Sequence, residues 1–388
     1  KLTQGATPND ALSWEKRKTI DAGLDFRLWD RFYGTLDWYQ TNTTDILMNA
    51  PISFAMTGQT SLTQNCGELR TRGFEFDLGV DIIKTPNTTW SFGVNGAHYK
   101  VKTISVPESM INMEDALHDK KWWQAGPDNW KALGAAGGGT NMFAYRRWIG
   151  GDYYNLVAAK YMGVDKNTGL PMFGALVTEE NHSKFPEANV GDVVATTDHT
   201  QAYMFDMGDA TPDLIGGFST SFRWKNLDFS ATFAFQIGGL FFSHMYADYI
   251  YASSNVGARY LSQELVGNMF NANNENAKFP MMFASPFNGQ DTYVGGNRVN
   301  AGNTYTDLAI FDASYLSVKN ITIGYSLPQK WMDKAGIGGV RIYASFDNMW
   351  LIARQGIDPR NSLTGGYDVG PMPYPQIRSC SLGVNITF

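Results

Sequence analysis

The sequence predicts an all-β protein, an antiparallel transmembrane β-barrel, from three observations. Apolar and polar residues alternate with a period of two outside the loops, as in strands with two different faces. The connections between these segments alternate between short turns and long loops. Aromatic residues make up 14% of the 388 residues and glycine accounts for 40 of them, whereas only 18% are charged. Soluble domains carry roughly 25% charged residues.

Eleven strands are expected from the alternation. It is clearest in the run DFSATFAFQI, where Phe229, Phe233 and Phe235 share one face with Ala231 and Ile237. It is weakest in the fifth and sixth segments. The predicted strands cover residues 17–28, 32–47, 68–83, 88–104, 151–163, 169–178, 214–224, 227–239, 311–327, 338–352 and 376–388.

The lengths of the connections orient the predicted barrel. Short turns are expected near residues 29–30, 85–88 and 224–226. Outer-membrane barrels have short periplasmic turns and long extracellular loops. The first and last strands then both run toward the periplasm, and the C-terminus is expected there. The long connections cover residues 48–67, 105–150, 179–213, 239–310 and 354–375.

A soluble β-sandwich or propeller is the alternative fold. Such folds also have alternating strands, but their outward faces are polar and their loops are of comparable length. Loops of 40 to 70 residues are uncommon in compact soluble domains. The loop pattern therefore favours the barrel. An odd number of strands means either that the strand count is wrong or that the chain is the second part of a larger barrel.

Composition excludes several classes of function. The formal net charge is −6, from 31 Lys and Arg against 37 Asp and Glu, without a basic run, which argues against a nucleic-acid partner. The five histidines lack metal-ligand spacing, so no metal or other cofactor is expected, and no catalytic constellation indicates an enzyme. Cys66 and Cys380 are expected to be free thiols. The run DKNTG at 165–169 lacks most calcium-loop positions and is expected to be a polar turn.

An aromatic loop at residues 113–134 is the best candidate for ligand contact. Its indole rings could stack on sugar rings or pack on a peptide, and its polar side chains could supply hydrogen bonds. Contacts with a partner protein, or packing within the loop, are the alternatives. The candidate residues are Trp122, Trp123, Asp128, Asn129 and Trp130.

Motifs across most of the chain resemble those of SusC/RagA-type TonB-dependent outer-membrane transporters. The match is most specific in the last 80 residues, where a YLxxKNxTxGYxLP strand precedes an RxYxxxxN strand and a DP loop. The matching runs are YLSVKNITIGYSLPQKW at 315–331, VRIYASFDNMW at 340–350, GIDPR at 356–360, YPQIRSCSLGVNITF at 374–388, and upstream segments at 14–47, 65–78, 163–173 and 211–239.

This resemblance implies a 22-stranded barrel around a plug domain. Residues 1–388 would then be its C-terminal portion of about 11 strands, with the plug and the TonB box outside this sequence. It also implies import of oligosaccharides or oligopeptides, energised by TonB–ExbB–ExbD and assisted by a SusD-like surface lipoprotein. A secreted carbohydrate-binding or hydrolytic β-protein and a passive porin are the alternative functions.

The last strand is expected to form the closing seam of the barrel. Its apolar residues should face outer-membrane lipid, and it should pair with the first strand of the barrel, because open backbone groups are not tolerated in hydrocarbon. The resemblance further implies that the terminal aromatic belongs to the assembly signal. The residues of this seam are Leu382, Val384, Ile386 and Phe388.

Overall fold

The computed structural model describes most of the chain. No helix among the described residues is long and apolar enough to cross a membrane. The described residues are 9–52, 61–106, 144–145, 149–198, 201–243, 246, 250, 262–271, 273–274, 276–281, 293–294, 297–298, 306–353, 358–361 and 376–388.

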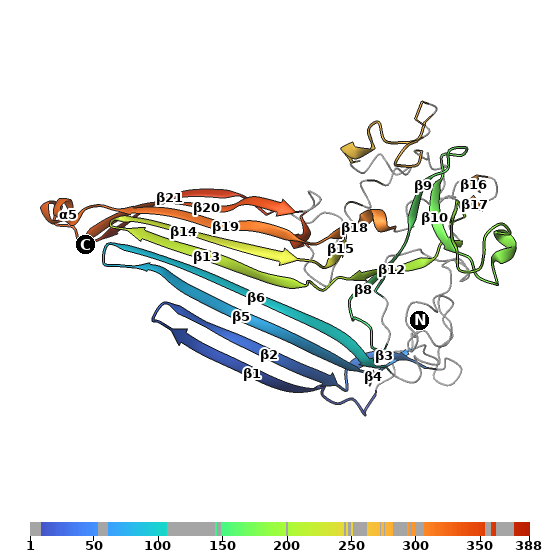
Figure 1. Ribbon diagram of the computed structural model, residues 1–388, viewed down its shortest axis with the longest axis horizontal. Coiled ribbons are helices and arrows are strands. Elements are labelled where there is room, and N and C mark those ends of the chain that lie inside the picture. The colour runs from blue at the N-terminus through green and yellow to red at the C-terminus, as the bar shows by residue number, and fades with distance from the viewer. Residues whose placement is uncertain are drawn as a thin grey trace, which may run out of the picture.

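One tall antiparallel sheet forms most of the molecule (Figure 1). Its described part has nine strands, and each strand pairs with its neighbours in chain order. This confirms the all-β class and nine of the predicted strands. The strands are β1 (Lys16–Leu28), β2 (Phe32–Thr44), β5 (Glu68–Lys84), β6 (Thr88–Ser105), β13 (Leu214–Trp224), β14 (Leu227–Ile237), β19 (Tyr315–Ser326), β20 (Gly339–Ala353) and β21 (Ser379–Thr387).

The fifth and sixth predicted strands do not join this sheet. Residues 151–163 and 169–178 instead contribute β8 (Asn155–Ala159), β9 (Tyr161–Val164) and β10 (Pro171–Leu176) to two small sheets. All five residues of β8 are buried, so this strand belongs to the core of a separate unit and has no solvent or lipid face. The described large sheet therefore has nine strands, not eleven. The small sheets are completed by β7 (Ala144–Tyr145), β11 (Val193–Thr196) and β12 (Met204–Asp209).

The described parts of the long connections gather at one end of the sheet (Figure 1). We call the described residues between β6 and β13 (149–213) and between β14 and β19 (239–314) the cap. Most of the fully buried side chains, including Leu156, Val177, Phe241, Phe242 and Phe279, lie there. The remaining strands are β3 (Leu47–Pro51), β4 (Ser61–Asn65), β15 (Leu240–Phe242), β16 (Tyr293–Val294), β17 (Asn297–Arg298) and β18 (Ile310–Asp312).

The short connections lie at the opposite end, beside helix α5 (Gln329–Ala335) (Figure 1). In the turn between β1 and β2, Trp29 and Asp30 both have positive φ angles, of 52° and 53°. The amide of Arg31 donates to the carbonyl of Leu28 at 3.1 Å. These values define a two-residue type I′ turn, whose twist matches that of the paired strands.

The two faces of the sheet differ in chemistry along its whole width. One register row consists almost entirely of apolar residues, and the adjacent row on the other face has only polar residues and glycines apart from one tyrosine. The apolar row is Leu28, Phe32, Val80, Phe92, Thr220, Ala231, Ile321, Phe346 and Cys380. The polar row is Arg27, Tyr33, Gly79, Gly93, Ser219, Thr232, Asn320, Asp347 and Ser379.

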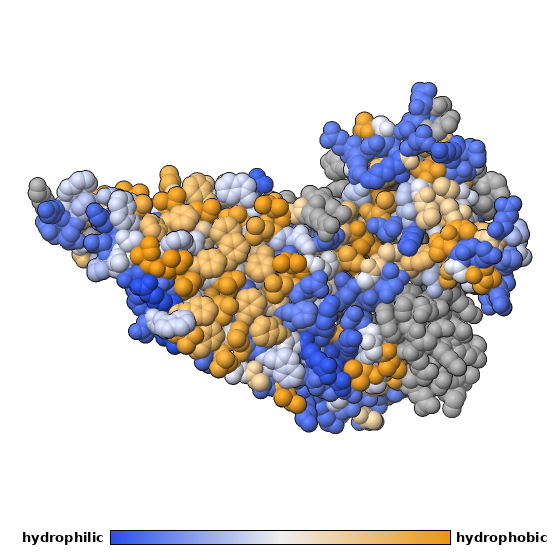
Figure 2. Space-filling model, in the orientation of Figure 1, coloured by the Kyte–Doolittle hydropathy of each residue, from blue (hydrophilic) through white to orange (hydrophobic). Residues whose placement is uncertain are grey.

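We call the apolar face the outer face and the polar face the inner wall. Figure 2 shows a broad hydrophobic area over the strands, which we call the apolar belt. The residues Leu382, Val384 and Ile386 of β21 lie on this face, opposite Ala344, Ile342 and Val340. This confirms the predicted alternation of the last strand.

The sheet is open among the described residues. β1 pairs only with β2, and β21 pairs only with β20, so both outermost strands leave one edge unpaired there. Closure of β21 against another strand of the barrel stays a prediction.

Candidate functional site: the cap and the inner wall

The predicted aromatic loop lies outside the described residues. The contacts of Trp122, Trp123, Asp128, Asn129 and Trp130 therefore stay predictions. The described residues show instead the unit that stands over the end of the sheet, and how it is attached.

The two halves of the cap are packed into one unit. The Phe173 ring is 3% exposed and packs with Ala159 and Ala202. Ala159 forms an isolated parallel bridge with Thr306, from the other half of the cap. The amide of Tyr161 donates to Asp307 Oδ1 at 2.8 Å. The sequence pattern missed this unit because its strands are short, and because β8 and most of β10 are buried on both faces and do not alternate.

A hydrogen-bond and ion-pair network holds the second half of the cap together and joins it to the first half. Glu264 accepts a hydrogen bond from the Tyr246 hydroxyl at 2.7 Å and forms an ion pair with Lys278. The Lys278 carbonyl in turn accepts from the Tyr161 hydroxyl at 2.8 Å. The hydrogen bond from Lys278, followed by that from Tyr246, lowers the pKa of Glu264. Ionised Glu264 therefore stabilises this part of the cap.

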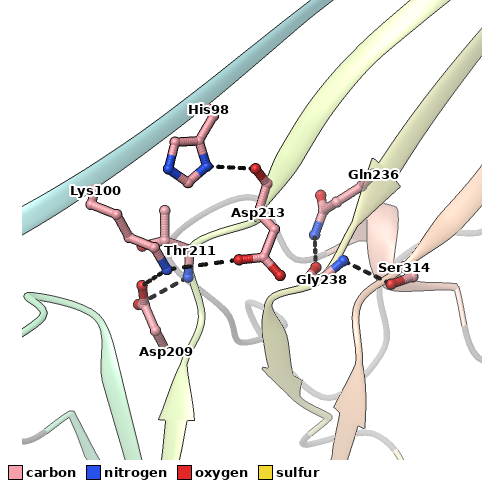
Figure 3. Close-up of polar contacts among 8 residues, drawn as sticks. All are labelled: His98, Lys100, Asp209, Thr211, Asp213, Gln236, Gly238 and Ser314. Carbon is pink, nitrogen blue, oxygen red and sulfur yellow. Dashed lines mark hydrogen bonds and ion pairs between the residues drawn. The ribbon is translucent and has the colours of Figure 1, made fainter. Parts of the chain in front are cut away.

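A polar junction attaches the first half of the cap to β6 (Figure 3). Lys100 Nζ lies 3.1 Å from Asp209 Oδ2 and 4.0 Å from Asp213 Oδ1. His98 Nδ1 lies 2.6 Å from the Asp213 carbonyl oxygen, so the proton of this contact is on Nδ1. The Thr211 amide donates to Asp209 Oδ1 at 3.0 Å.

The same junction includes the ends of β14 and β19 (Figure 3). The Gly238 amide donates to Ser314 Oγ at 2.9 Å, and its carbonyl accepts from Gln236 Nε2 at 3.4 Å. Gly238 has φ +71°, and a Cβ there would collide with the Asp213 carboxylate. Glycine is therefore required where the chain leaves the sheet. Side chains from four connected segments thus hold the cap in one place.

Asp152 adds a half-buried carboxylate near this junction. Burial raises the pKa of Asp152 and the Asp209 carboxylate raises it further, whereas Lys100 and Lys102 lower it. Its Oδ1 atom is buried without a hydrogen-bond partner in the described part of the chain. The neighbouring Tyr153 amide pairs with the Val101 carbonyl at 2.8 Å, which extends the β6 edge into the cap.

The inner wall is acidic over its first three strands. These carboxylates lie on the polar face, as the alternation predicted for Asp21, Asp25, Glu75, Asp77 and Asp81. Asp37 lies there too, directly opposite Glu75. Like charges in directly opposed positions repel each other. This stretch of wall therefore favours a cationic or hydrogen-bond-donating neighbour.

The inner wall of the later strands is mostly neutral and uses hydroxyl and amide groups. Asn320 donates to Ser345 Oγ at 2.9 Å and to Asp347 Oδ1 at 2.7 Å. An ion pair joins Arg341 to Asp228, with Nε to Oδ1 at 3.0 Å and Nη2 to Oδ2 at 2.6 Å. These groups can donate hydrogen bonds to a polar ligand and accept hydrogen bonds from it.

The polar turn predicted at 165–169 is confirmed. Asp165 accepts hydrogen bonds from the Asn167 amide at 3.2 Å and from the Thr168 hydroxyl, and these bonds lower its pKa. Gly169 closes the turn with φ +71°. No group of three His, Cys, Asp or Glu residues in the described ranges is arranged to hold a metal ion. Cys66 and Cys380 are free thiols.

Comparisons with known proteins agree on one class. Residues 2–174 match the family model described as TonB dependent receptor-like, beta-barrel. The chain is 27% identical over 98% of its length to the TonB-dependent receptor P3 of Formosa agariphila, of which it covers 35%. It is 25% identical over 98% of its length to the TonB-dependent receptor SusC of Bacteroides thetaiotaomicron, of which it covers 32%.

A solved structure of the RagAB peptide transporter shares the fold. It superposes on 98% of this chain with a TM-score of 0.70 and 21% identity, and the chain covers 36% of it. The chain thus spans about a third of the length of the relatives that it matches.

Proposed function

We propose that this chain belongs to the SusC/RagA-type TonB-dependent receptors and that it forms the C-terminal barrel wall of an outer-membrane importer for oligosaccharides or oligopeptides. Receptors of this kind are transporters, not an enzyme family. The plug and the TonB box would lie outside residues 1–388.

The contrast between the two faces of the sheet carries this proposal. The outer face presents an unbroken apolar belt, whereas the inner wall presents carboxylates, hydroxyls and amides. A barrel in lipid needs an apolar exterior and a polar lumen. A secreted soluble β-protein would expose this belt to water, which soluble monomers avoid for patches beyond a few hundred square ångströms.

The ends of the sheet orient the proposed transporter. Short turns and α5 gather at one end and the folded cap at the other (Figure 1). We assign the short-turn end, with the C-terminus, to the periplasm and the cap to the cell exterior, as in other outer-membrane barrels. A SusD-like lipoprotein would then close over the cap end, where cargo enters.

The cargo would bind noncovalently and would not be cleaved. The aromatic loop with Trp122, Trp123 and Trp130 would supply stacking faces, and Asp128 and Asn129 would supply hydrogen bonds. The hydroxyl and amide groups of the inner wall offer further hydrogen bonds along the way. TonB–ExbB–ExbD would supply the force that moves the plug.

Uptake in cells with and without TonB tests the mechanism. Deletion strains are first grown on candidate glycans and peptides to identify the cargo, and uptake of that cargo is then measured. The proposal predicts loss of uptake without TonB. Uptake that persists without TonB would instead indicate a passive porin, and a native chain found soluble without detergent would indicate the secreted alternative.

The aromatic loop is tested by Trp122→Ala combined with Trp123→Ala. Removal of two stacking faces should weaken cargo binding to the purified receptor by about tenfold or more. Trp29→Ala, in a short turn at the opposite end of the sheet, is the matched control and should bind normally. Unchanged cargo binding by the double variant would show that this loop is not part of the binding site.

A further inference from the structure

Five cations lie together on the outer face, immediately beyond the apolar belt at the cap end. In one register row Lys18, Asn42, Arg70 and Lys102 lie side by side across β1, β2, β5 and β6. In the next row toward the belt lie Gln40, Arg72 and Lys100. We call Lys18, Arg70, Arg72, Lys100 and Lys102 the basic collar.

The basic collar is continuous with the apolar belt. The next row on the same face consists of Trp38, Phe74 and His98, and the belt follows from there. Two residues along a strand span about 7 Å, so the collar lies within one side-chain length of the belt edge. Figure 2 shows hydrophilic residues between the hydrophobic area and the cap. In a barrel whose belt lies in hydrocarbon, this level is that of the lipid head groups.

The two arginines of the collar are held by neutral amides. Arg70 Nε donates to Asn42 Oδ1 at 3.2 Å, and Arg72 Nε donates to Gln40 Oε1 at 2.7 Å. These bonds fix each guanidinium group through its inner nitrogen and leave the terminal nitrogens available. A guanidinium group with free terminal nitrogens can bind a phosphate through two parallel hydrogen bonds.

Two other arginines of the described residues bind carboxylates instead. Arg341 and Arg360 each bind a carboxylate through two nitrogens, those of Asp228 and Asp358. Within the described residues, Arg70 and Arg72 have no ion pair with a carboxylate, although they stand two positions apart on one face.

The acidic groups near the collar are already engaged. Asp209 pairs with Lys100 at 3.1 Å, and Asp152 lies in the field of Lys100 and Lys102. Glu68, on the neighbouring row, accepts from the Asn42 amide at 3.1 Å. Among the described residues Lys18, Arg70 and Arg72 form no ion pair with a carboxylate, although Glu68 keeps its negative charge beside them.

We propose that the basic collar binds the phosphate groups of phosphorylated glycolipid head groups in the leaflet on the cap side. This inference rests on the membrane placement in the proposed function and goes beyond it. The arginine forks would bind phosphate oxygens, Lys18 would add a point charge, and the acyl chains of the same lipid would lie against Trp38 and Phe74. Bound lipid would brace the wall beneath the point where Lys100 holds the cap.

The test uses the full-length receptor, purified from outer membranes in detergent, with lipid A as the probe. Binding of phosphorylated lipid A is compared with that of chemically dephosphorylated lipid A by native mass spectrometry. The proposal predicts that removal of the phosphates weakens binding about tenfold or more and that added salt weakens binding of the phosphorylated form. Equal binding of the two lipids by the wild-type receptor would overturn the proposal.

Arg70→Gln combined with Arg72→Gln then locates the site. This variant should reduce binding of phosphorylated lipid A to the level of the dephosphorylated lipid. Lys225→Gln combined with Lys330→Gln is the matched control, because both lysines are exposed at the short-turn end. If the collar variant binds phosphorylated lipid A as tightly as the wild type does, the collar is not the phosphate-binding site.

Two further readouts separate this inference from the proposed function. Fractionation of the same preparations reports whether the receptor resides in the outer membrane, and cargo uptake reports transport. A receptor that resides in the outer membrane and imports cargo, but binds both forms of lipid A equally, contradicts only the proposed lipid site of the basic collar. A native receptor that stays soluble without detergent contradicts the membrane placement itself.

Discussion

Gly324 on the inner wall permits an ion pair between strands that are not neighbours. Arg341 of β20 reaches Asp228 of β14 across β19, and a Cβ on Gly324 would lie against both charged groups. The two side chains are 32% and 35% exposed, so the pair is only partly shielded from water. An alanine at this position should push the partners apart.

Gly324→Ala should lower the free energy of unfolding by about 1–2 kcal/mol, given the partial exposure of the pair. Gly93→Ala is the control, because a Cβ there has its nearest neighbour, Ser219 Oγ, at 3.5 Å. Urea unfolding of the barrel in detergent micelles, followed by tryptophan fluorescence, measures both. Equal effects of the two substitutions would mean that the ion pair contributes nothing.

Leu382 tests the orientation of β21. Its side chain is 84% exposed on the outer face, whereas Ser381 lies on the inner wall. Leu382→Arg should cost about 2–4 kcal/mol near the bilayer midplane, because charge on the lipid side is poorly solvated. Ser381→Arg should cost much less, and refolding into lipid vesicles measures the difference. A larger cost for Ser381→Arg would reverse the assigned faces.

Glu264 makes part of the cap sensitive to acid. Its pKa in the folded chain lies below the ordinary value of 4.5, because Lys278 and Tyr246 hydrogen-bond to the ionised form. The stabilisation is therefore present above about pH 4.5 and is lost as the pH falls through the lower pKa of the folded state.

Hydrogen exchange of residues 262–281, corrected for intrinsic rates, measures this effect. Glu264→Gln should exchange faster than the wild type at pH 7, and the difference should shrink below pH 4.5. A difference that is independent of pH would exclude the ionised carboxylate as its source.

At the scale of elements, the cap strands fold around their own core. Phe173 of β10 packs on Ala159 of β8 and Ala202, and is 3% exposed. Phe173→Ala should destabilise the cap by about 3–5 kcal/mol and leave the large sheet intact. Met162→Ala, at a side chain that is 41% exposed, is the control. Limited proteolysis should cut the Phe173 variant within the cap first, and simultaneous loss of cap and sheet would contradict separate cores.

The sequence predicted the sheet better than the cap for a physical reason. Strands with one apolar and one polar face alternate, and the nine strands of the large sheet were each identified to within a few residues. β8 reads NLVAA and is buried throughout, so the sequence of this short apolar run does not show whether the strand belongs to the barrel or to another core. The count of eleven came from this ambiguity.

The site was less predictable because it depends on pairing between distant strands. The acidic inner wall followed from alternation alone, since each carboxylate occupies a polar position in its own strand. The junction of Lys100 with Asp209, and the amides that hold Arg70 and Arg72, join residues 28 to 109 positions apart. The spacing of residues within one segment does not predict contacts between distant segments.

At the scale of the whole molecule, the proposed function depends on which face of the sheet meets lipid. The apolar belt, the polar inner wall, the cap at one end and the collar above the belt are all oriented by that assignment. If the sheet were a soluble layer, both the import function and the lipid site would lose their physical basis.

Fluorescence of single-cysteine variants along β21 tests this assignment most directly. Each residue from Ser381 to Ile386 is replaced in turn in a receptor whose Cys66 and Cys380 are changed to serine. Each variant is labelled with an environment-sensitive dye and reconstituted in bilayers with brominated acyl chains. The account predicts strong quenching at Leu382, Val384 and Ile386 and weak quenching at the positions between them. Uniform quenching, or none, would contradict a membrane-spanning β21.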